Sequence, residues 1–310
     1  MFCTILNIFF YIGCARVILS LISILKSLYT HKLQTSLNLP ERYGKGSYAV
    51  IADATSEIGQ AFAKKLADLG FNLVLLYKDE QKLAQLGLKN SNVETKTIHA
   101  DFETFAETED YEKIVEQLKD IDVSIIVNNV ETKNLEKFEA TTTEELSACL
   151  KANNASCAII TVMMLKQLMS RELKRSAIIN LSSAQGIVPI SNISMFSGTK
   201  GFVRFFSRGI TEEYKKKIDI LTCCPGLLKS EFTDKIFMKQ CASPDESVAT
   251  FLKSLGQQEE VSSSIVDDFV FYGVLQQIYF CSFKLYNEFI DKYCVKFVEK
   301  LQSASKLKKE

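Results

Sequence analysis

The stretch SYAVIADATSEIGQAFAKKLADLGFNLVLLY, residues 47–77, decides the fold that we expect for this chain. Residues 47–53 are almost continuously apolar and predict a buried strand. Residues 58–70 have the spacing of an amphipathic helix, and Gly70 is a typical helix end. Residues 71–77 return to a buried strand. This order predicts one strand–helix–strand unit of a parallel sheet.

The same alternation continues along the chain. We expect further strands at residues 93–101, 123–129, 176–183 and 218–226, and further helices at residues 79–87, 105–119, about 143–172 and about 195–215. Near-continuous apolar strands indicate a parallel sheet that is covered on both faces. The sequence therefore predicts an α/β, doubly wound, Rossmann-like domain over residues 47–262, with ligands at the carboxyl ends of its strands.

Composition narrows the function classes. The chain has 310 residues, 47% of them hydrophobic and 24% charged, which is typical of a globular protein. Its 37 basic residues balance 37 acidic ones, so no net field attracts nucleic acid. Nine cysteines without regular spacing and only two histidines argue against a disulfide framework and a metal site. We expect no metal, no nucleic-acid partner and a reducing compartment.

Both ends of the chain carry apolar segments. Residues 2–25 are long enough to span a bilayer, although Arg16 would cost about 2.5–3.5 kcal/mol at its centre. We expect a membrane anchor over residues 1–32, with an amphipathic or core helix as the alternative, and a polar connector over residues 33–46. The lysines after the apolar run favour a domain that faces the cytosol. Residues 263–310 predict an aromatic-rich helical tail that packs on the domain, caps a pocket or lies on the membrane.

Several motifs in order resemble the short-chain dehydrogenase/reductase superfamily over about residues 46–230. The matching pieces include ADATSEIGQAFAKKLADLG, HADF, IVNNV, INLSS, FSGTK and PGLLKS. The resemblance is closest to the membrane-anchored hydroxysteroid dehydrogenase and 3-ketoacyl-CoA reductase branch. It implies the Rossmann-like fold, NADP(H) as the cofactor, and a steroid or fatty-acyl ligand.

The resemblance also assigns catalytic positions. In that family a tyrosine protonates the substrate carbonyl, a lysine lowers the tyrosine pKa and holds the cofactor ribose, a serine binds the substrate oxygen, and an asparagine orders a relay water. By position, Ser183, Lys200 and Asn153 match the serine, lysine and asparagine, but Phe196 replaces the tyrosine. Losing a positioned general acid removes about 10²–10⁴-fold of rate. Without the family match, Ser183 and Lys200 would be a strand-end serine and a surface lysine.

The cofactor loop departs further from the family. The pattern T-G-x-x-x-G-x-G aligns with residues 52–59, where Thr55, Ile58 and Gly59 hold cofactor-binding positions and only Gly59 is still glycine. Asp53 and Glu57 replace the two glycines that let the backbone turn and approach the pyrophosphate. Glu131 replaces the glycine of the family's N-N-A-G segment. Three glycines near the cofactor phosphates have become acids.

These acids oppose a phosphate ligand. A unit charge about 4 Å from a phosphate costs about 1 kcal/mol in water and about 4 kcal/mol at an effective dielectric constant of 20. A carboxylate at a helix N-terminus is itself stabilised by the helix dipole. We expect Glu57 to sit where the pyrophosphate would bind; the alternative is that Asp53 and Glu57 point to solvent and cap the helix.

Other cofactor positions are retained. The resemblance places Lys78 at the NADP 2′-phosphate, Asp101 at the adenine, Asn128 near the adenosine and Ser230 at the carboxamide. Lys78 lacks the bidentate fork of the arginine in some relatives.

Two functions follow. The favoured one is a membrane-anchored, catalytically impaired or inactive protein that resembles hydroxysteroid dehydrogenase-like proteins, which also carry phenylalanine for tyrosine, and that acts in lipid or steroid binding or as a scaffold. The alternative is an active NADPH-dependent reductase of 3-ketoacyl-CoA or a 17-ketosteroid. The terminal KLKKE resembles an endoplasmic-reticulum retrieval signal, so we expect that membrane, with the mitochondrion as the alternative. A homodimer is left open.

Overall fold

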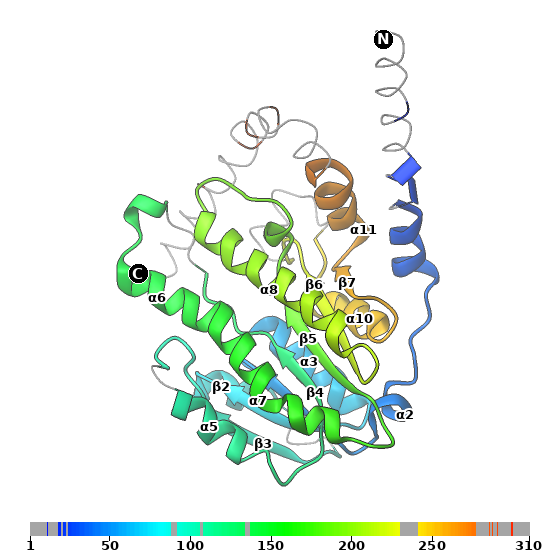
Figure 1. Ribbon diagram of the computed structural model, residues 1–310, viewed down its shortest axis with the longest axis vertical. Coiled ribbons are helices and arrows are strands. Elements are labelled where there is room, and N and C mark those ends of the chain that lie inside the picture. The colour runs from blue at the N-terminus through cyan, green and yellow to red at the C-terminus, as the bar shows by residue number, and fades with distance from the viewer. Residues whose placement is uncertain are drawn as a thin grey trace.

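A seven-stranded parallel sheet forms the centre of the protein (Figure 1). The computed structural model describes residues 24–87, 92–105, 108–133, 137–229 and 241–276, with isolated positions in both flanking segments. The strands are β1 (Tyr48–Ala52), β2 (Asn72–Tyr77), β3 (Thr95–His99), β4 (Val123–Asn128), β5 (Ser176–Leu181), β6 (Ile218–Cys224) and β7 (Glu260–Ser262).

Helices cover both faces of the sheet (Figure 1). The α-helices of the described residues are α2 (Leu39–Tyr43), α3 (Glu57–Asp68), α4 (Glu80–Gln85), α5 (Thr108–Glu116), α6 (Thr143–Leu150), α7 (Ser156–Ser170), α8 (Ser194–Tyr214), α10 (Pro244–Ser254) and α11 (Ile265–Asp267). Shorter helical turns are η1 (Tyr29–Leu33), η3 (Phe138–Ala140), η4 (Lys151–Ala155), η5 (Ala184–Gly186) and η6 (Asp268–Leu275). One apolar core joins the sheet to α2, α3 and α10, and a second joins it to α5 and α7.

The strand order places a ligand crevice at one point of the sheet. The order is β3-β2-β1-β4-β5-β6-β7, so the direction of winding reverses between β1 and β4. Ligands of doubly wound folds bind at this reversal, outside the carboxyl ends of the strands. Strands β1, β4 and β5 are buried along their whole length, as the apolar runs predicted. The predicted fold class is confirmed.

Two parts of the structure differ from the sequence prediction. The seventh strand, β7, and helix α10 were not predicted; β7 is only three residues long and forms by parallel pairing with β6. The connector over residues 33–46 is also more than a polar linker, because Leu39 and Tyr43 of α2 are buried in the core. Tyr43 and Arg42 bind the carboxylate of Asp219 at 2.9 and 2.6 Å and fasten the connector to β6.

Among the described residues, one helical stretch, Thr143–Ser170, is long and apolar enough to cross a membrane. Its second half, α7, packs against β4 and β5 and supplies buried residues to the core. We therefore interpret the stretch as a core helix. Most of the apolar run over residues 2–25 of the predicted anchor lies outside the described residues, as does the tail beyond residue 276 apart from a few positions.

Candidate functional site

The carboxyl end of β5 and the start of α8 form one unit. The Ser182 hydroxyl donates to the carbonyl oxygen of Lys200 at 2.7 Å, and the Lys200 ammonium donates to the carbonyl oxygen of Leu181 at 3.1 Å. Gly186 permits this approach, because a Cβ at Gly186 would lie 2.7 Å from the Lys200 carbonyl carbon. The segment that resembles the family's catalytic residues is therefore held at the crevice end of the sheet.

Phe196 is an apolar packing residue at the position of the family's tyrosine. Its side chain is buried, and its ring centroid lies 5.7 Å from Lys200 Nζ. A phenyl ring attracts the ammonium through its π face but has no proton to donate or accept. Phe196 therefore cannot act as a general acid.

Lys200 forms an ion pair that the sequence did not predict. The side chain is 1% exposed, so it is not a surface lysine, and its Nζ lies 2.9 Å from Glu131 Oε2. Glu131 also contacts Lys133, with 3.2 Å between Oε1 and Nζ. The acid at the former glycine position thus supplies a partly exposed counter-charge to the buried Lys200. The signal in the sequence was the loss of the tyrosine together with the gain of an acid in the N-N-A-G segment.

The charges of this pair are strongly coupled. Burial by itself would raise the pKa of the Glu131 carboxyl, but the attraction of Lys200 and Lys133 outweighs it and lowers the pKa to about 2. Glu131 is therefore ionised at neutral pH. The positive charge of the buried ammonium is therefore balanced by a carboxylate of the protein itself.

Ser183 and Asn153 are close to this unit, and their polar atoms are bound internally. The Ser183 hydroxyl contacts the Gln185 side-chain oxygen and the Pro225 carbonyl oxygen. The Asn153 side-chain oxygen accepts from the Thr132 amide at 2.7 Å, and its nitrogen donates to the Thr132 carbonyl at 3.0 Å and the Thr199 hydroxyl at 3.1 Å. The roles that the resemblance assigns to Ser183 and Asn153 stay predictions.

The loop between β1 and α3 keeps the family's turn without its first glycine. Asp53 has a φ of 54°, in the left-handed region that aspartate tolerates better than most residues. The Asn129 amide secures the turn by donating to the Asp53 carbonyl at 3.0 Å and the Ser56 hydroxyl at 2.8 Å. Thr55 is buried, and its hydroxyl donates to the Asp53 carboxylate at 3.1 Å. The aspartate is thus accommodated in the glycine conformation.

Glu57 is not the cap of helix α3, and its place at a pyrophosphate stays a prediction. The N-cap of α3 is Ser56, whose hydroxyl accepts from the Gly59 amide at 3.2 Å. Glu57 is the first helical residue, and its side chain is exposed. The helix end is therefore satisfied by a serine hydroxyl rather than by the Glu57 carboxylate, because the backbone turn places Ser56 and not Glu57 at the cap position. Ile58 packs against the core behind the loop.

Asp53 makes the crevice unfavourable for phosphate. Burial raises the pKa of the Asp53 carboxyl, and the negative charge of Glu131 raises it further. The acids of the former phosphate loop and of the N-N-A-G segment therefore already repel each other across the crevice. A dinucleotide would bring further negative charge to the same place.

Gly59, the one retained glycine, is required by packing. A Cβ at Gly59 would lie 2.2 Å from the Asp53 carbonyl oxygen. We expect Gly59→Ala to lower the free energy of unfolding by about 1–3 kcal/mol through overpacking. Gly209→Ala in α8 is the matched control, since a Cβ there meets no atom within 4 Å, and it should stabilise by up to about 1 kcal/mol. Urea denaturation measures both, and equal stabilities of the two variants would contradict the packing role.

The other predicted cofactor positions are also engaged within the protein. Lys78 Nζ lies 3.2 Å from Asp101 Oδ1 and 2.8 Å from Glu103 Oε2. The Asn128 amide donates to the Asn180 oxygen at 2.8 Å, beside the Thr161 hydroxyl. Ser230 lies outside the described residues. Among the described residues, no group of three or more histidine, cysteine, aspartate or glutamate side chains is placed to hold a metal ion.

These residues do not fit NADP(H). Glu131 supplies the partner of Lys200 that the family gives to tyrosine and ribose, and a carboxylate replaces the first glycine of the phosphate turn. Lys78, the cation for the 2′-phosphate, is held between two acids.

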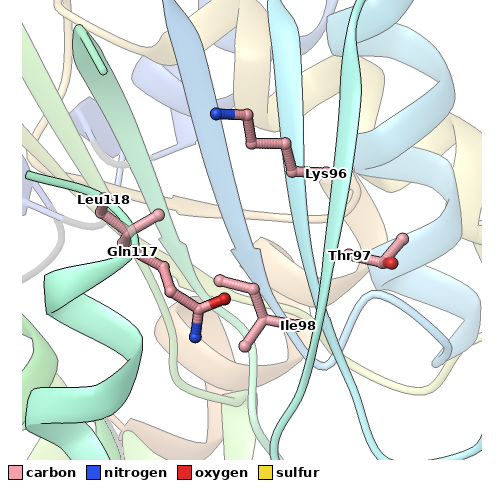
Figure 2. Close-up of a pocket in the computed structure, with 5 residues that line it drawn as sticks. All are labelled: Lys96, Thr97, Ile98, Gln117 and Leu118. Atoms are coloured by element: carbon pink, nitrogen blue, oxygen red, sulfur yellow. The ribbon is translucent and has the colours of Figure 1, made fainter. Parts of the chain in front are cut away.

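A cavity also lies away from this site. Its volume is about 470 Å³. It lies beside the edge strand β3, and Figure 2 shows the residues that line it, Lys96, Thr97, Ile98, Gln117 and Leu118. None of its lining residues belongs to the predicted site. A steroid or fatty-acyl ligand at the carboxyl ends of the strands stays a prediction.

Comparison with known proteins identifies the family to which the chain belongs. A family model described as short chain dehydrogenase matches residues 47–240, so the chain belongs to the short-chain dehydrogenase family, as its motifs predicted.

Within this family, the chain is similar to very-long-chain 3-oxoacyl-CoA reductases. The chain is 31% identical over 234 residues to very-long-chain 3-oxoacyl-CoA reductase-A of Danio rerio, covering 70% of this chain and 69% of the reductase. It is 32% identical over 219 residues to the Mus musculus very-long-chain 3-oxoacyl-CoA reductase, covering 67% of each chain.

Solved structures share the fold at low identity. The structure of a 7β-hydroxysteroid dehydrogenase aligns with a TM-score of 0.70 and 21% identity over 82% of this chain and 100% of its own. A Sphingobium yanoikuyae short-chain dehydrogenase, solved in complex with NADPH, aligns with a TM-score of 0.61 and 22% identity over 70% of this chain and 86% of its own.

Proposed function

We propose that this protein is a short-chain dehydrogenase whose redox site is closed by its own Glu131–Lys200 ion pair. It would serve as a membrane-attached lipid- or steroid-binding or scaffold protein rather than as a dehydrogenase. The observation that carries the proposal is the 2.9 Å contact between Lys200 Nζ and Glu131 Oε2, with a lysine that is 1% exposed. The lysine of the family motif is then unavailable to a ribose.

Phe196 supports the same conclusion independently. Even with a cofactor present, the position of the proton donor holds a phenyl ring. Two separate steps of a ketone reduction, cofactor binding and protonation of the carbonyl oxygen, would therefore be impaired.

Membrane attachment rests on the N-terminal segment. Its described residues expose large apolar side chains, including Ile22 at 54% and Leu25 at 65%. Such exposure along one helix is typical of a segment in contact with lipid rather than water. The apolar run and the lysines that follow it favour a membrane anchor with the domain in the cytosol, and we propose the endoplasmic-reticulum membrane.

The second candidate is an NADPH-dependent 3-oxoacyl-CoA reductase, which the identities of 31 and 32% to such reductases favour. An assay of NADPH oxidation with a long-chain 3-oxoacyl-CoA distinguishes the two. We expect the wild-type protein to oxidise NADPH at the same rate as the Lys200→Ala variant. A rate well above background that Lys200→Ala abolishes would establish the reductase and refute the proposal.

A further inference from the structure

A small polar cavity lies where the N-terminal segment meets the edge of the sheet, apart from the Lys200 site. Its volume is about 110 Å³. Lys26 and Ser27 line it from the N-terminal side, Glu260 from β7, and Asp268 and Tyr272 from η6. Figure 1 shows this region at the top right of the molecule, where the N-terminal segment runs beside α11.

The cavity is built into the fold because hydrogen bonds fasten its two sides together. The Gln258 amide donates to the Thr30 hydroxyl and to the Gln34 side-chain oxygen, both at 2.6 Å. Gln34 in turn donates to the Lys253 carbonyl at 3.2 Å, and Lys253 Nζ donates to the His31 carbonyl at 3.1 Å. The segment after the apolar run is therefore held in a fixed position against α10 and β7.

The inner end of the cavity is acidic. Asp268 Oδ2 lies 3.1 Å from His31 Nε2. Burial would raise the pKa of the Asp268 carboxyl, but His31 and neighbouring hydroxyls outweigh it and keep the pKa below its ordinary value. Glu260 is bound by Arg204 at 2.7 and 2.9 Å and by the Tyr272 hydroxyl at 2.6 Å. Two charged carboxylates thus border one small space.

The Ser27 hydroxyl is buried beside Asp268 at the wall of the cavity. The Ser27 side chain is 8% exposed, and its Oγ lines the cavity without a hydrogen bond of normal geometry to any described residue. Buried hydroxyl groups in folded proteins nearly always have a well-formed hydrogen bond, so one that lines a cavity without such a bond indicates a ligand or water. Lys26, which is exposed, adds a cation at the rim.

The side chains change from apolar to cationic to acidic along the chain and into the cavity. The apolar residues 2–25 come first, the cation of Lys26 follows, and the carboxylates lie on the domain side. A zwitterionic phospholipid has the complementary order of acyl chains, phosphate and ammonium. A cation at the membrane surface attracts the phosphate, and carboxylates beyond it attract the ammonium.

We propose that this cavity binds the headgroup of a phospholipid with a primary ammonium, such as phosphatidylethanolamine. Lys26 would contact the phosphate, and Asp268, Glu260 and the Ser27 hydroxyl would accept hydrogen bonds from the ammonium. A quaternary ammonium has no N–H groups for these acceptors and is recognised instead by several aromatic rings. Among the described residues, Tyr272 is the one aromatic side chain that lines this cavity. The inference rests on the proposed membrane attachment.

The test compares lipids on the full-length chain. Hydrogen–deuterium exchange of residues 24–34 and 258–272 is measured on vesicles of phosphatidylcholine and on vesicles in which phosphatidylethanolamine replaces half of it. We expect about tenfold slower exchange with phosphatidylethanolamine. Ser27→Ala and Lys26→Gln should remove most of this difference, and Lys32→Gln, an exposed lysine outside the cavity, should keep it. Equal exchange on both vesicles, or three variants that behave alike, would mean that the cavity holds only water and would overturn the proposal.

A second experiment, with short-chain lipids in solution, tests the headgroup site independently of membrane attachment. If the chain binds neither vesicle, the proposed attachment fails, and the detergent-solubilised chain is then titrated with dihexanoyl-phosphatidylethanolamine, dihexanoyl-phosphatidylcholine and inorganic phosphate. Affinity at least fivefold higher for the ethanolamine lipid, lost in Ser27→Ala, supports the site. Equal affinities for the two lipids, or equal protection by inorganic phosphate, would overturn it.

Discussion

Glu131→Gln is expected to lower the free energy of unfolding by about 3–5 kcal/mol, because it leaves the Lys200 ammonium buried without a counter-charge. Lys200 is 1% exposed, and Glu131 is its one carboxylate partner among the described residues. Urea denaturation at pH 7 measures the loss. Glu139→Gln, an exposed glutamate on the following segment, should change stability by less than about 0.5 kcal/mol.

A double variant tests the contribution of the Glu131–Lys200 ion pair to stability. In Glu131→Gln/Lys200→Met the buried charge is gone, so most of the lost stability should return. If the double variant is as unstable as the sum of two independent losses, the two side chains do not interact as the structure indicates.

The same pair gives a pH signature with a defined sign. The folded-state pKa of Glu131 is about 2, below its ordinary value of 4.5, so the folded state releases the proton more readily. The stabilisation is then fully present above about pH 4.5 and is lost as the pH falls towards 2. The difference in unfolding free energy between the wild type and Glu131→Gln should shrink over that range. A constant difference would contradict an ionised Glu131 in the pair.

The second large effect is on activity. We expect Phe196→Tyr alone to give no NADPH oxidation with a 3-oxoacyl-CoA, because the restored phenol has neither a free Lys200 nor a bound cofactor. Turnover should appear only when Asp53→Gly, Glu57→Gly and Glu131→Gly are added. The phenol should then contribute about 10²–10⁴-fold in rate over the same triple variant that retains Phe196.

This series of variants ranks the substitutions by their expected importance for activity. The structure places Glu131 on Lys200, so Glu131→Gly is expected to be the indispensable change, and Glu57→Gly the least important because Glu57 is exposed. Turnover from Phe196→Tyr by itself would show that cofactor binding is intact. That result would refute the closed site.

The centre of the sheet was predictable because β1, β4 and β5 are buried on both faces and appear as continuous apolar runs, whereas the edge strand β3 is mostly exposed. Each of the six strands that the sequence predicted is present, and the helical region at about residues 143–172 corresponds to α6, η4 and α7. Strand β7 was missed because three residues carry no period and its place depends on pairing with β6. Local patterns fix individual elements, whereas an edge strand depends on tertiary contacts.

The site was predictable as a set of positions and not as a set of contacts. The motifs located Ser183, Phe196 and Lys200, and the loss of the tyrosine suggested that the lysine had lost its partner. The structure supplies the new partner, Glu131, from a segment 69 positions earlier in the sequence. A contact over that separation leaves no local pattern. Ser56 rather than Glu57 is the helix cap because the backbone turn places the serine at the N-cap position.

The most direct measurement of the closed site is a calorimetric titration of the full-length protein with NADPH. The account predicts no saturable heat at concentrations up to about 1 mM, since the internal carboxylates would cost several kcal/mol against the cofactor phosphates. The triple variant Asp53→Gly/Glu57→Gly/Glu131→Gly should gain measurable binding under the same conditions. Micromolar binding of NADPH to the wild-type protein would contradict the account.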